Sequence, residues 1–136
     1  MTALLDTGLL LAVLDASDDL HEIYVTALQE ETEPLLPDVV LPELAFMVLR
    51  ELDYPAPTTF LRSIAQGEIT IERTATEDLS RAAEVLEKYA DNRVDFVDCA
   101  IVAIAERLNV TRILTVDRRH FELFRPQHCA VFEISP

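Results

Sequence analysis

Two short apolar runs near opposite ends of the chain each stop at an aspartate. Ala-Leu-Leu leads into Asp6, and Arg-Ile-Leu-Thr-Val leads into Asp117. Runs this short and this apolar are typical of strands buried on both faces, as in a parallel sheet covered by helices. The carboxyl ends of such strands lie along one edge, where open α/β folds gather their functional groups. The pattern therefore predicts that acids from distant segments share one edge of a sheet.

The segments between these runs carry helical periodicity and helix-boundary residues. The sequence predicts strands at residues 3–6, 35–36, 69–72, 112–116 and 131–134, and helices at residues 7–14, 18–31, 42–54, 58–65, 76–89 and 96–108. Asp18 is the expected N-cap of the second helix, and Pro42 is expected at the first position of the third. Strands that alternate with helices indicate a three-layer α/β/α fold with a central, mostly parallel sheet.

The length and composition favour a single domain over residues 1–136. A chain of 136 residues that is 50% hydrophobic can bury about two-thirds of its unfolded surface without disulfides or structural metals. Cys99 and Cys129 have no metal-ligand spacing and are expected to be small core residues in a reduced chain. The N-terminal apolar stretch is interrupted by Asp6 and is too short to span a bilayer. We therefore expect a cytoplasmic protein that does not enter membranes.

The charge balance limits the class of partner. The chain has 25 acidic and 11 basic residues and a formal charge of −14, which disfavours unaided binding to nucleic acid or to an anionic membrane. A polyanionic substrate would need a bound divalent cation or a local basic cluster. Arg118 and Arg119 directly follow Asp117, and guanidinium groups suit bidentate phosphate contacts. These two arginines are candidate substrate-binding residues, the alternative being a solvated loop.

Four acids occupy comparable positions, namely Asp6, Glu43, Asp98 and Asp117. Each one alone could simply cap a helix or sit in its first turn. Their apolar neighbours, however, draw these carboxylates toward a low-dielectric interior, and no Lys or Arg lies among those neighbours to pair with them. A buried charge requires a partner. Because oxygen ligands select hard cations, the four acids predict a site for Mg²⁺, with Mn²⁺ as a possible substitute.

Three further residues are candidate supports for this site. Thr115 precedes Asp117 by two positions, so on a strand both side chains point to one face and the hydroxyl could orient a water molecule or the aspartate. Thr7 either does likewise or only begins a helix. Asp95 is either the N-cap of the helix that contains Asp98 or an extra ligand. The chain has three histidines. His120, beside Phe121, is expected to serve packing, and His21 and His128 carry no argument for catalysis.

Four motifs resemble those of a known family. They are Leu-Leu-Asp-Thr, Pro-Glu-Leu-Ala, Asp-Phe-Val-Asp-Cys-Ala-Ile-Val-Ala-Ile-Ala-Glu-Arg-Leu and Leu-Thr-Val-Asp-Arg-Arg-His-Phe. Together they resemble the PIN-domain ribonucleases, specifically the VapC-type toxins of toxin–antitoxin pairs, over nearly the whole chain. The resemblance implies that Asp6, Glu43, Asp98 and Asp117 bind the metal and that the protein is a Mg²⁺-dependent endoribonuclease. It also implies a homodimer and a cognate antitoxin that inhibits the enzyme by entering its site.

The sequence leaves other functions open. A phosphatase or phosphotransfer domain with Asp6 as nucleophile would need a second acid two residues later, where the chain has Gly8. A non-catalytic metal-binding interaction module and a housekeeping PIN nuclease in RNA processing are the remaining alternatives. The acidic composition favours a structured RNA such as tRNA, recognised by shape and a few loop contacts. Phe46, Met47 and Leu49 exceed what one buried helix face needs and predict a partner surface, the alternative being core packing.

Overall fold

A five-stranded sheet forms the centre of the computed structural model, which describes residues 2–136. Its strand order is β3-β2-β1-β4-β5, and every neighbouring pair is parallel. The strands are β1 (Thr2–Leu5), β2 (Glu33–Pro37), β3 (Thr70–Glu72), β4 (Arg112–Leu114) and β5 (Glu133–Ser135). The central strand β1 aligns Leu4 with Leu35 on one side and with Ile113 on the other. The predicted parallel sheet is confirmed.

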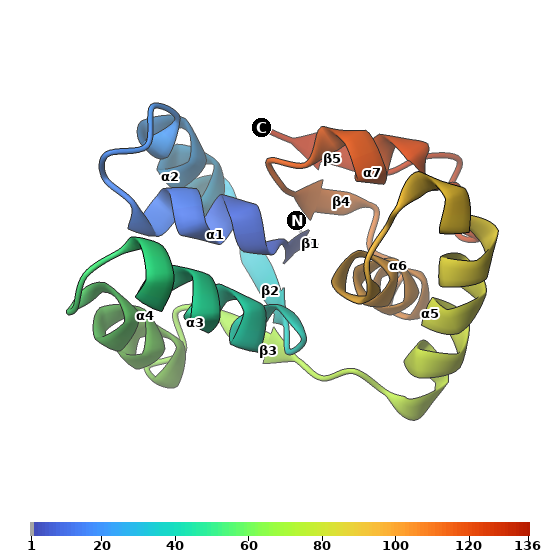
Figure 1. The fold of residues 1–136 in the computed structure, drawn as a ribbon, viewed down its shortest axis with the longest axis horizontal. Helices are drawn as coiled ribbons and strands as arrows, with labels where there is room; N and C mark the ends of the chain where they lie inside the picture. Colours follow the sequence, from blue (N-terminus) through green and yellow to red (C-terminus); the bar gives the residue numbers. More distant parts are fainter. Residues whose placement is uncertain (1) are drawn as a thin grey trace.

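Helices cover both faces of this sheet (Figure 1). One layer contains α1 (Thr7–Leu14), α2 (His21–Glu30), α3 (Val40–Glu51) and α4 (Ala56–Ala65), on the left in Figure 1. The other contains α5 (Thr76–Lys88) and α6 (Phe96–Leu108), joined by the 3₁₀ turn η1 (Ala90–Asn92), on the right. The short helix α7 (Arg118–Leu123) follows β4 and contacts β5. The arrangement is the three-layer α/β/α fold that the sequence predicts.

The two elements that carry Asp6 and Asp98 are the most deeply buried. Leu4 and Leu5 of β1 have no exposed surface, because strands flank β1 on both sides and helices cover both faces. In α6 every residue from Asp98 to Ala105 is buried, since the helix lies between the sheet and α5. A helix that is apolar around its whole circumference must be enclosed in this way. The positions of both acids are therefore fixed by core packing.

The chain order creates a crevice at the carboxyl end of β1. From β1 the chain proceeds outward to β2 and β3, and then crosses to the opposite side of β1 to form β4 and β5. The connections that follow β1 and β4 therefore run in opposite directions and leave a gap between them. Open α/β folds bind ligands at such a point. The backbone N–H of Asp6 donates to the carbonyl of Leu114 at 3.0 Å. The ends of β1 and β4 are thus tied together beneath the crevice.

Several predicted boundaries need correction. The second helix begins at His21, because the Asp18 carboxylate accepts the N–H of Leu20 in the preceding turn and does not cap the helix. The third helix begins at Val40, so Pro42 lies inside its first turn, where a missing N–H leaves no bond unmade. The fourth begins at Ala56, and the fifth ends at Lys88.

The differences among the strands lie at their ends. The strand predicted at residues 112–116 ends at Leu114, and α7, which the sequence argument did not predict, starts four residues later. The last strand covers Glu133–Ser135 in place of residues 131–134. Both cysteines are free thiols, as expected. Across the described part of the chain, none of the helices has the length and apolarity needed to cross a bilayer.

Candidate metal centre

Asp6 lies at the junction of β1 and α1 and is buried. One carboxylate oxygen accepts the N–H of Thr7 at 2.8 Å, so the aspartate caps α1 as the capping hypothesis expected. The other oxygen accepts the hydroxyl of Thr115 at 2.8 Å. Thr115 is itself almost completely buried. Asp6 is therefore held on two sides, by the first residue of α1 and by the residue that follows β4.

Asp98 lies in the first turn of α6, and Asp95 caps the same helix. The Asp95 carboxylate accepts the N–H of Asp98 at 2.8 Å, which confirms the N-cap interpretation. Asp98 is buried whereas Asp95 is exposed. The cap fixes the backbone at Asp98, and the enclosed helix α6 fixes the direction of its side chain. Asp98 consequently has little freedom to move away from the crevice.

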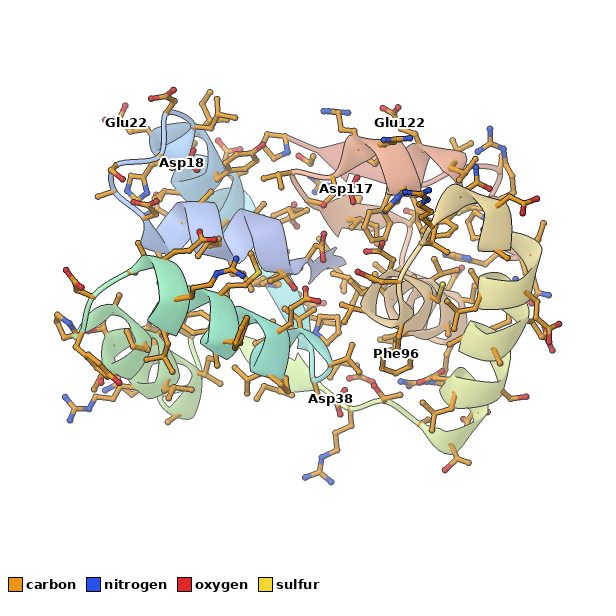
Figure 2. The ribbon with its side chains drawn as sticks, viewed as in Figure 1. Asp18, Glu22, Asp38, Phe96, Asp117 and Glu122 are labelled. Carbon is orange, nitrogen blue, oxygen red and sulfur yellow. The ribbon has the colours of Figure 1, made fainter. Side chains whose placement is uncertain are left out.

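Asp117 caps α7. Its backbone N–H donates to the hydroxyl of Thr115 at 2.9 Å, and its carboxylate accepts the N–H of His120 at 3.2 Å. Figure 2 shows Asp117 on the inner side of α7, whereas Glu122 points outward from the same helix. Thr115 thus orients Asp6 through its side-chain proton and Asp117 through the backbone.

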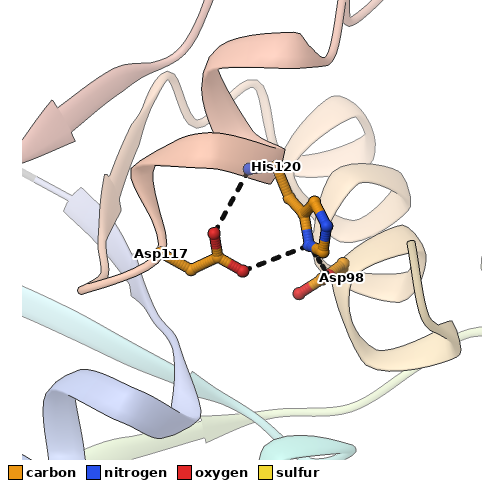
Figure 3. Close-up of side chains that lie close together, drawn as sticks. All are labelled: Asp98, Asp117 and His120. Carbon is orange, nitrogen blue, oxygen red and sulfur yellow. Dashed lines mark hydrogen bonds and ion pairs between the residues drawn. The ribbon is translucent and has the colours of Figure 1, made fainter. Parts of the chain in front are cut away.

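His120 joins two of the acids directly (Figure 3). Its Nδ1 lies 3.0 Å from a carboxylate oxygen of Asp98 and 3.1 Å from one of Asp117. From the sequence, His120 was expected to serve packing because it lies beside Phe121. The structure instead places the ring between carboxylates from α6 and α7, while the following residue, Phe121, provides the packing.

A cavity of about 210 Å³ lies over these groups. All four predicted acids line it: Asp6, Glu43, Asp98 and Asp117. The other lining residues are Thr7, Gly8, Met47, Asp95, Val116 and His120. Glu43 reaches the cavity from the first turn of α3. Residues from α1, α3, α6 and the β4–α7 segment therefore converge, as the edge argument predicted.

Burial and mutual repulsion change the acidity of the two buried aspartates. Desolvation raises the pKa of Asp6 from 3.8 to about 6, and the negative charges of Glu43 and Asp117 add to the rise, against hydrogen bonds from Thr115 and Thr7 that lower it. Desolvation likewise raises the pKa of Asp98 to about 7, with Asp95 and Asp6 adding to the rise and His120 opposing it. Without a cation, these two aspartates therefore keep their protons to a higher pH than ordinary aspartates do, and a cation would displace those protons.

The donor set fits a hard divalent cation. Ligand atoms of Asp98, Asp117 and His120 all lie within 4.8 Å of one another. Carboxylate oxygens suit Mg²⁺ and Mn²⁺, and an imidazole nitrogen is better tolerated by Mn²⁺. The hydroxyl oxygen of Thr7 is buried and has no hydrogen-bond partner among residues 2–136. An unsatisfied buried hydroxyl in a cavity of carboxylates is suited to a water molecule from a cation's hydration shell.

A sequence model of the PIN domain family matches residues 3–125. The chain belongs to the PIN domain family. A curated relative of this PIN domain, Ribonuclease VapC26 of Mycobacterium tuberculosis, is 31% identical over 134 residues, which cover 98% of this chain and 99% of the relative.

Solved structures share the fold of this PIN domain. Mycobacterium tuberculosis VapC20, described as a sarcin-ricin loop cleaving toxin, superposes with a TM-score of 0.79 at 17% identity and covers 88% of this chain and 92% of its own. VapBC2 from Rickettsia felis, solved with a DNA fragment from its promoter, superposes with a TM-score of 0.72 at 16% identity and covers 100% of both chains. FitAcB from Neisseria gonorrhoeae superposes with a TM-score of 0.68 at 16% identity and covers 100% of this chain and 97% of its own.

The two candidate substrate-binding arginines of this PIN domain have different surroundings. Arg118 donates to the carbonyl of Pro136 at 2.5 Å and lies 3.7 Å from Glu122, so its guanidinium group is engaged at the C-terminus. Arg119 lines a second hollow that adjoins the cavity through His120. Sequence reasoning did not identify His120 as a residue of the site, nor Arg93, which lines the same hollow. The only sequence signal for Arg93 was its position just before the Asp-Phe-Val-Asp motif.

Proposed function

We propose that this PIN domain is a metal-dependent endoribonuclease and the toxin of a type II toxin–antitoxin pair that acts in the cytoplasm. Asp6, Glu43, Asp98 and Asp117 hold the cation, which is Mg²⁺ or Mn²⁺. The observation that carries the proposal is the meeting of these four acids, from four separate segments, in one cavity. Similarity to Ribonuclease VapC26 over 98% of the chain supports the ribonuclease activity and the toxin role.

The residues of the site have distinct tasks in hydrolysis. A divalent cation, when bound, lowers the pKa of water and neutralises charge on a phosphoryl oxygen. Asp6 and Asp98 are fixed by the core and determine where the cation binds. Asp117 is held in place because it is itself the N-cap of α7. Glu43 approaches from α3, the opposite wall, and so closes the ring of carboxylates around one position.

The hydrogen bonds beneath the acids prepare the site before substrate binds. Thr115 directs one oxygen of Asp6, and His120 bridges Asp98 and Asp117. Two carboxylates about 5 Å apart repel by roughly 3 kcal/mol at an effective dielectric near 20, so they would separate without such restraints. The supports keep the acids at ligand spacing while no cation is bound.

The substrate we propose is a structured RNA such as tRNA. A net charge of −14 gives no long-range attraction for polyanions, so affinity depends on local contacts near the site and on RNA shape. Cleavage of one folded RNA among many, and poor cleavage of unstructured RNA, is the expected pattern. Equal cleavage of all RNAs would contradict this part of the proposal.

The partner surface we propose lies on α3. Phe46 is 64% exposed and Leu49 is 53% exposed, and their spacing of three places them on one helical face. Arg50 stacks over the Phe46 ring at 5.5 Å. An exposed apolar face of this kind suits a second copy of the chain or an antitoxin helix. A Leu49→Asp variant that remains dimeric and still binds antitoxin would exclude this face.

The decisive experiment compares the wild-type chain with Asp98→Asn. The wild type should cleave RNA with added Mg²⁺ or Mn²⁺ and lose cleavage in a chelator, and the variant should remain folded but inactive. Sequencing the cleaved ends after controlled expression identifies the target. Cation-dependent stabilisation without cleavage of any cellular RNA would instead favour the non-catalytic metal-binding module.

A further inference from the structure

A second hollow adjoins the metal cavity on the side of α7. Its volume is about 500 Å³, and it is lined by Asp91, Asn92, Arg93, Arg119, His120 and Leu123. His120 also lines the metal cavity, so one imidazole forms a wall of both. A linear polymer bound with one unit over the metal site would therefore have a path into this hollow.

The two arginines of the hollow have no partner within the protein. Neither Arg93 nor Arg119 makes a side-chain hydrogen bond or ion pair with any of residues 2–136, and both are exposed. Most other arginines are committed to carboxylates, as Arg81 is to Glu106 at 2.7 Å and Arg107 is to Asp78 at 3.0 Å. In a chain of charge −14, two unpaired guanidinium groups beside a ring of acids are positioned to attract an anion.

The backbone at Arg93 gives an independent argument. Arg93 has φ 56° and ψ 36°, the left-handed region, which disfavours residues with a long side chain and favours Gly or Asn. At the one other non-glycine position among residues 2–136 with positive φ, the chain has Asn109. The Arg93 backbone N–H donates to the carbonyl of Ala90 at 3.5 Å, but its side chain makes no hydrogen bond or ion pair among residues 2–136 that offsets this disfavoured conformation. Residues kept in such conformations commonly serve a ligand.

We infer that Arg93 and Arg119 form a subsite for a backbone phosphate of the RNA, next to the phosphate that is cleaved. Guanidinium forks bind phosphate oxygens in pairs, and each arginine approaches from a different wall: Arg93 from the end of η1 and Arg119 from α7. Asp91, which also lines the hollow, disfavours a more highly charged terminal phosphate. The inference rests on the proposed ribonuclease function and adds where the substrate chain lies.

The test measures binding of a fluorescein-labelled RNA stem–loop with a single-stranded loop, by anisotropy at several salt concentrations. All proteins carry Asp98→Asn so that the RNA stays intact. Arg93→Asn and Arg119→Ala should each weaken binding by about tenfold, the effect of one charged hydrogen-bond pair. Each should also reduce the slope of log affinity against log salt by about 0.7, the value for one phosphate contact to a single strand.

The controls separate this effect from unfolding and from general charge. Arg93→Asn should raise the melting temperature, because Asn suits the left-handed conformation, so weaker binding by a more stable protein is not an unfolding effect. Arg62→Ala on α4 removes the same charge from the opposite helical layer and should leave the salt slope unchanged. Without Asp98→Asn, Mn²⁺ affinity should be the same for Arg93→Asn, Arg119→Ala and the wild type.

Two results would overturn the inference in distinguishable ways. Unchanged RNA affinity and salt slope in both arginine variants, together with normal cleavage by the wild type, would reject the subsite alone. Failure of the wild type to cleave RNA with any divalent cation would reject the ribonuclease and, with it, the subsite.

Discussion

The hydroxyl of Thr115 donates a 2.8 Å hydrogen bond to Asp6, across 109 positions of sequence. The same oxygen accepts the N–H of Asp117 at 2.9 Å. One buried threonine at the end of β4 therefore sets the relative positions of two of the four acids. Parallel pairing of β1 with β4 makes this possible, because it brings the carboxyl ends of both strands to one edge.

Thr115→Val tests this link. Valine retains the shape and strand preference of threonine but removes the bond to Asp6, so the pKa of Asp6 should rise further above its present value of about 6. We expect a loss of roughly 1–2 kcal/mol in unfolding free energy and weaker Mn²⁺ binding at neutral pH. Urea denaturation and Mn²⁺ titration measure the two effects. Thr115→Ser should restore both, and Thr70→Val on the exposed strand β3 is the matched control.

The acids were predictable because their signals are local. An apolar run that ends in an acid identifies a strand end, and the spacing between Asp95 and Asp98 identifies a helix start. The rule that parallel strand ends share an edge then brings the acids together without further information. These positions depend on secondary structure and strand order alone, which sequence patterns encode directly.

The neighbours of the acids depend on tertiary structure and were not predictable in the same way. His120 reaches Asp98 only because α7 turns back over α6, and the residues after β4 gave no helical pattern long enough to predict α7. That Arg119 lines the second hollow, whereas Arg118 does not, follows from where that helix starts. Arg93 lies in the left-handed conformation at the end of a single 3₁₀ turn. The sequence does not predict this conformation, because arginine rarely adopts it.

Asp98→Asn should stabilise the metal-free protein while abolishing cleavage. The pKa of Asp98 is raised to about 7, first by burial and then by Asp95 and Asp6, so at pH values above 7 the folded state contains an unfavourable charge that asparagine lacks. The rise in melting temperature that the substitution causes in a chelator should therefore be larger at pH 8 than at pH 5. Asp19→Asn, at an exposed position, is the control. A lower melting temperature at pH 8 would mean that the hydrogen bonds of the Asp98 carboxylate stabilise the folded protein more than its burial and repulsion destabilise it.

The stability of the metal-free protein should fall as pH rises from about 4 to 8. Asp6 and Asp98 have folded-state pKa values near 6 and 7, above their ordinary 3.8, so over this interval the folded state binds more protons than the unfolded state. The stabilising contribution of the protonated acids is complete below 3.8 and is lost through pH 6–7. Mn²⁺ competes for the same oxygens, so the rise in melting temperature that it causes should increase over the same range. Scanning calorimetry with and without Mn²⁺ measures both trends, and a metal effect that is equal at all pH values would contradict the coupling.

Gly8→Ala should disturb the cavity by contact with Val116. A Cβ at position 8 would lie 2.5 Å from Val116 Cγ2, and the β-branched valine has few alternative rotamers. Although alanine favours a helix by about 1 kcal/mol over glycine, the clash should displace the β4–α7 segment and weaken Mn²⁺ binding. Val116→Ala provides the missing space, so the double variant should bind Mn²⁺ as well as the wild type. Equal losses in the single and double variants would show that the contact is not the cause.

His120→Ala tests whether the imidazole joins the metal site. Nδ1 and oxygens of Asp98 and Asp117 lie within 4.8 Å of one another, close enough for one cation to contact all three after small side-chain movements. We expect the pulsed EPR spectrum of bound Mn²⁺ to show coupling to one nitrogen, which disappears in His120→Ala. Because nitrogen ligands favour Mn²⁺ over Mg²⁺, the variant should lose more Mn²⁺ affinity than Mg²⁺ affinity. His21→Ala removes a histidine that instead bonds the carbonyl of Ala12, and it should leave the spectrum unchanged. A nitrogen-free spectrum in the wild type would limit His120 to bridging the two carboxylates from outside the coordination shell.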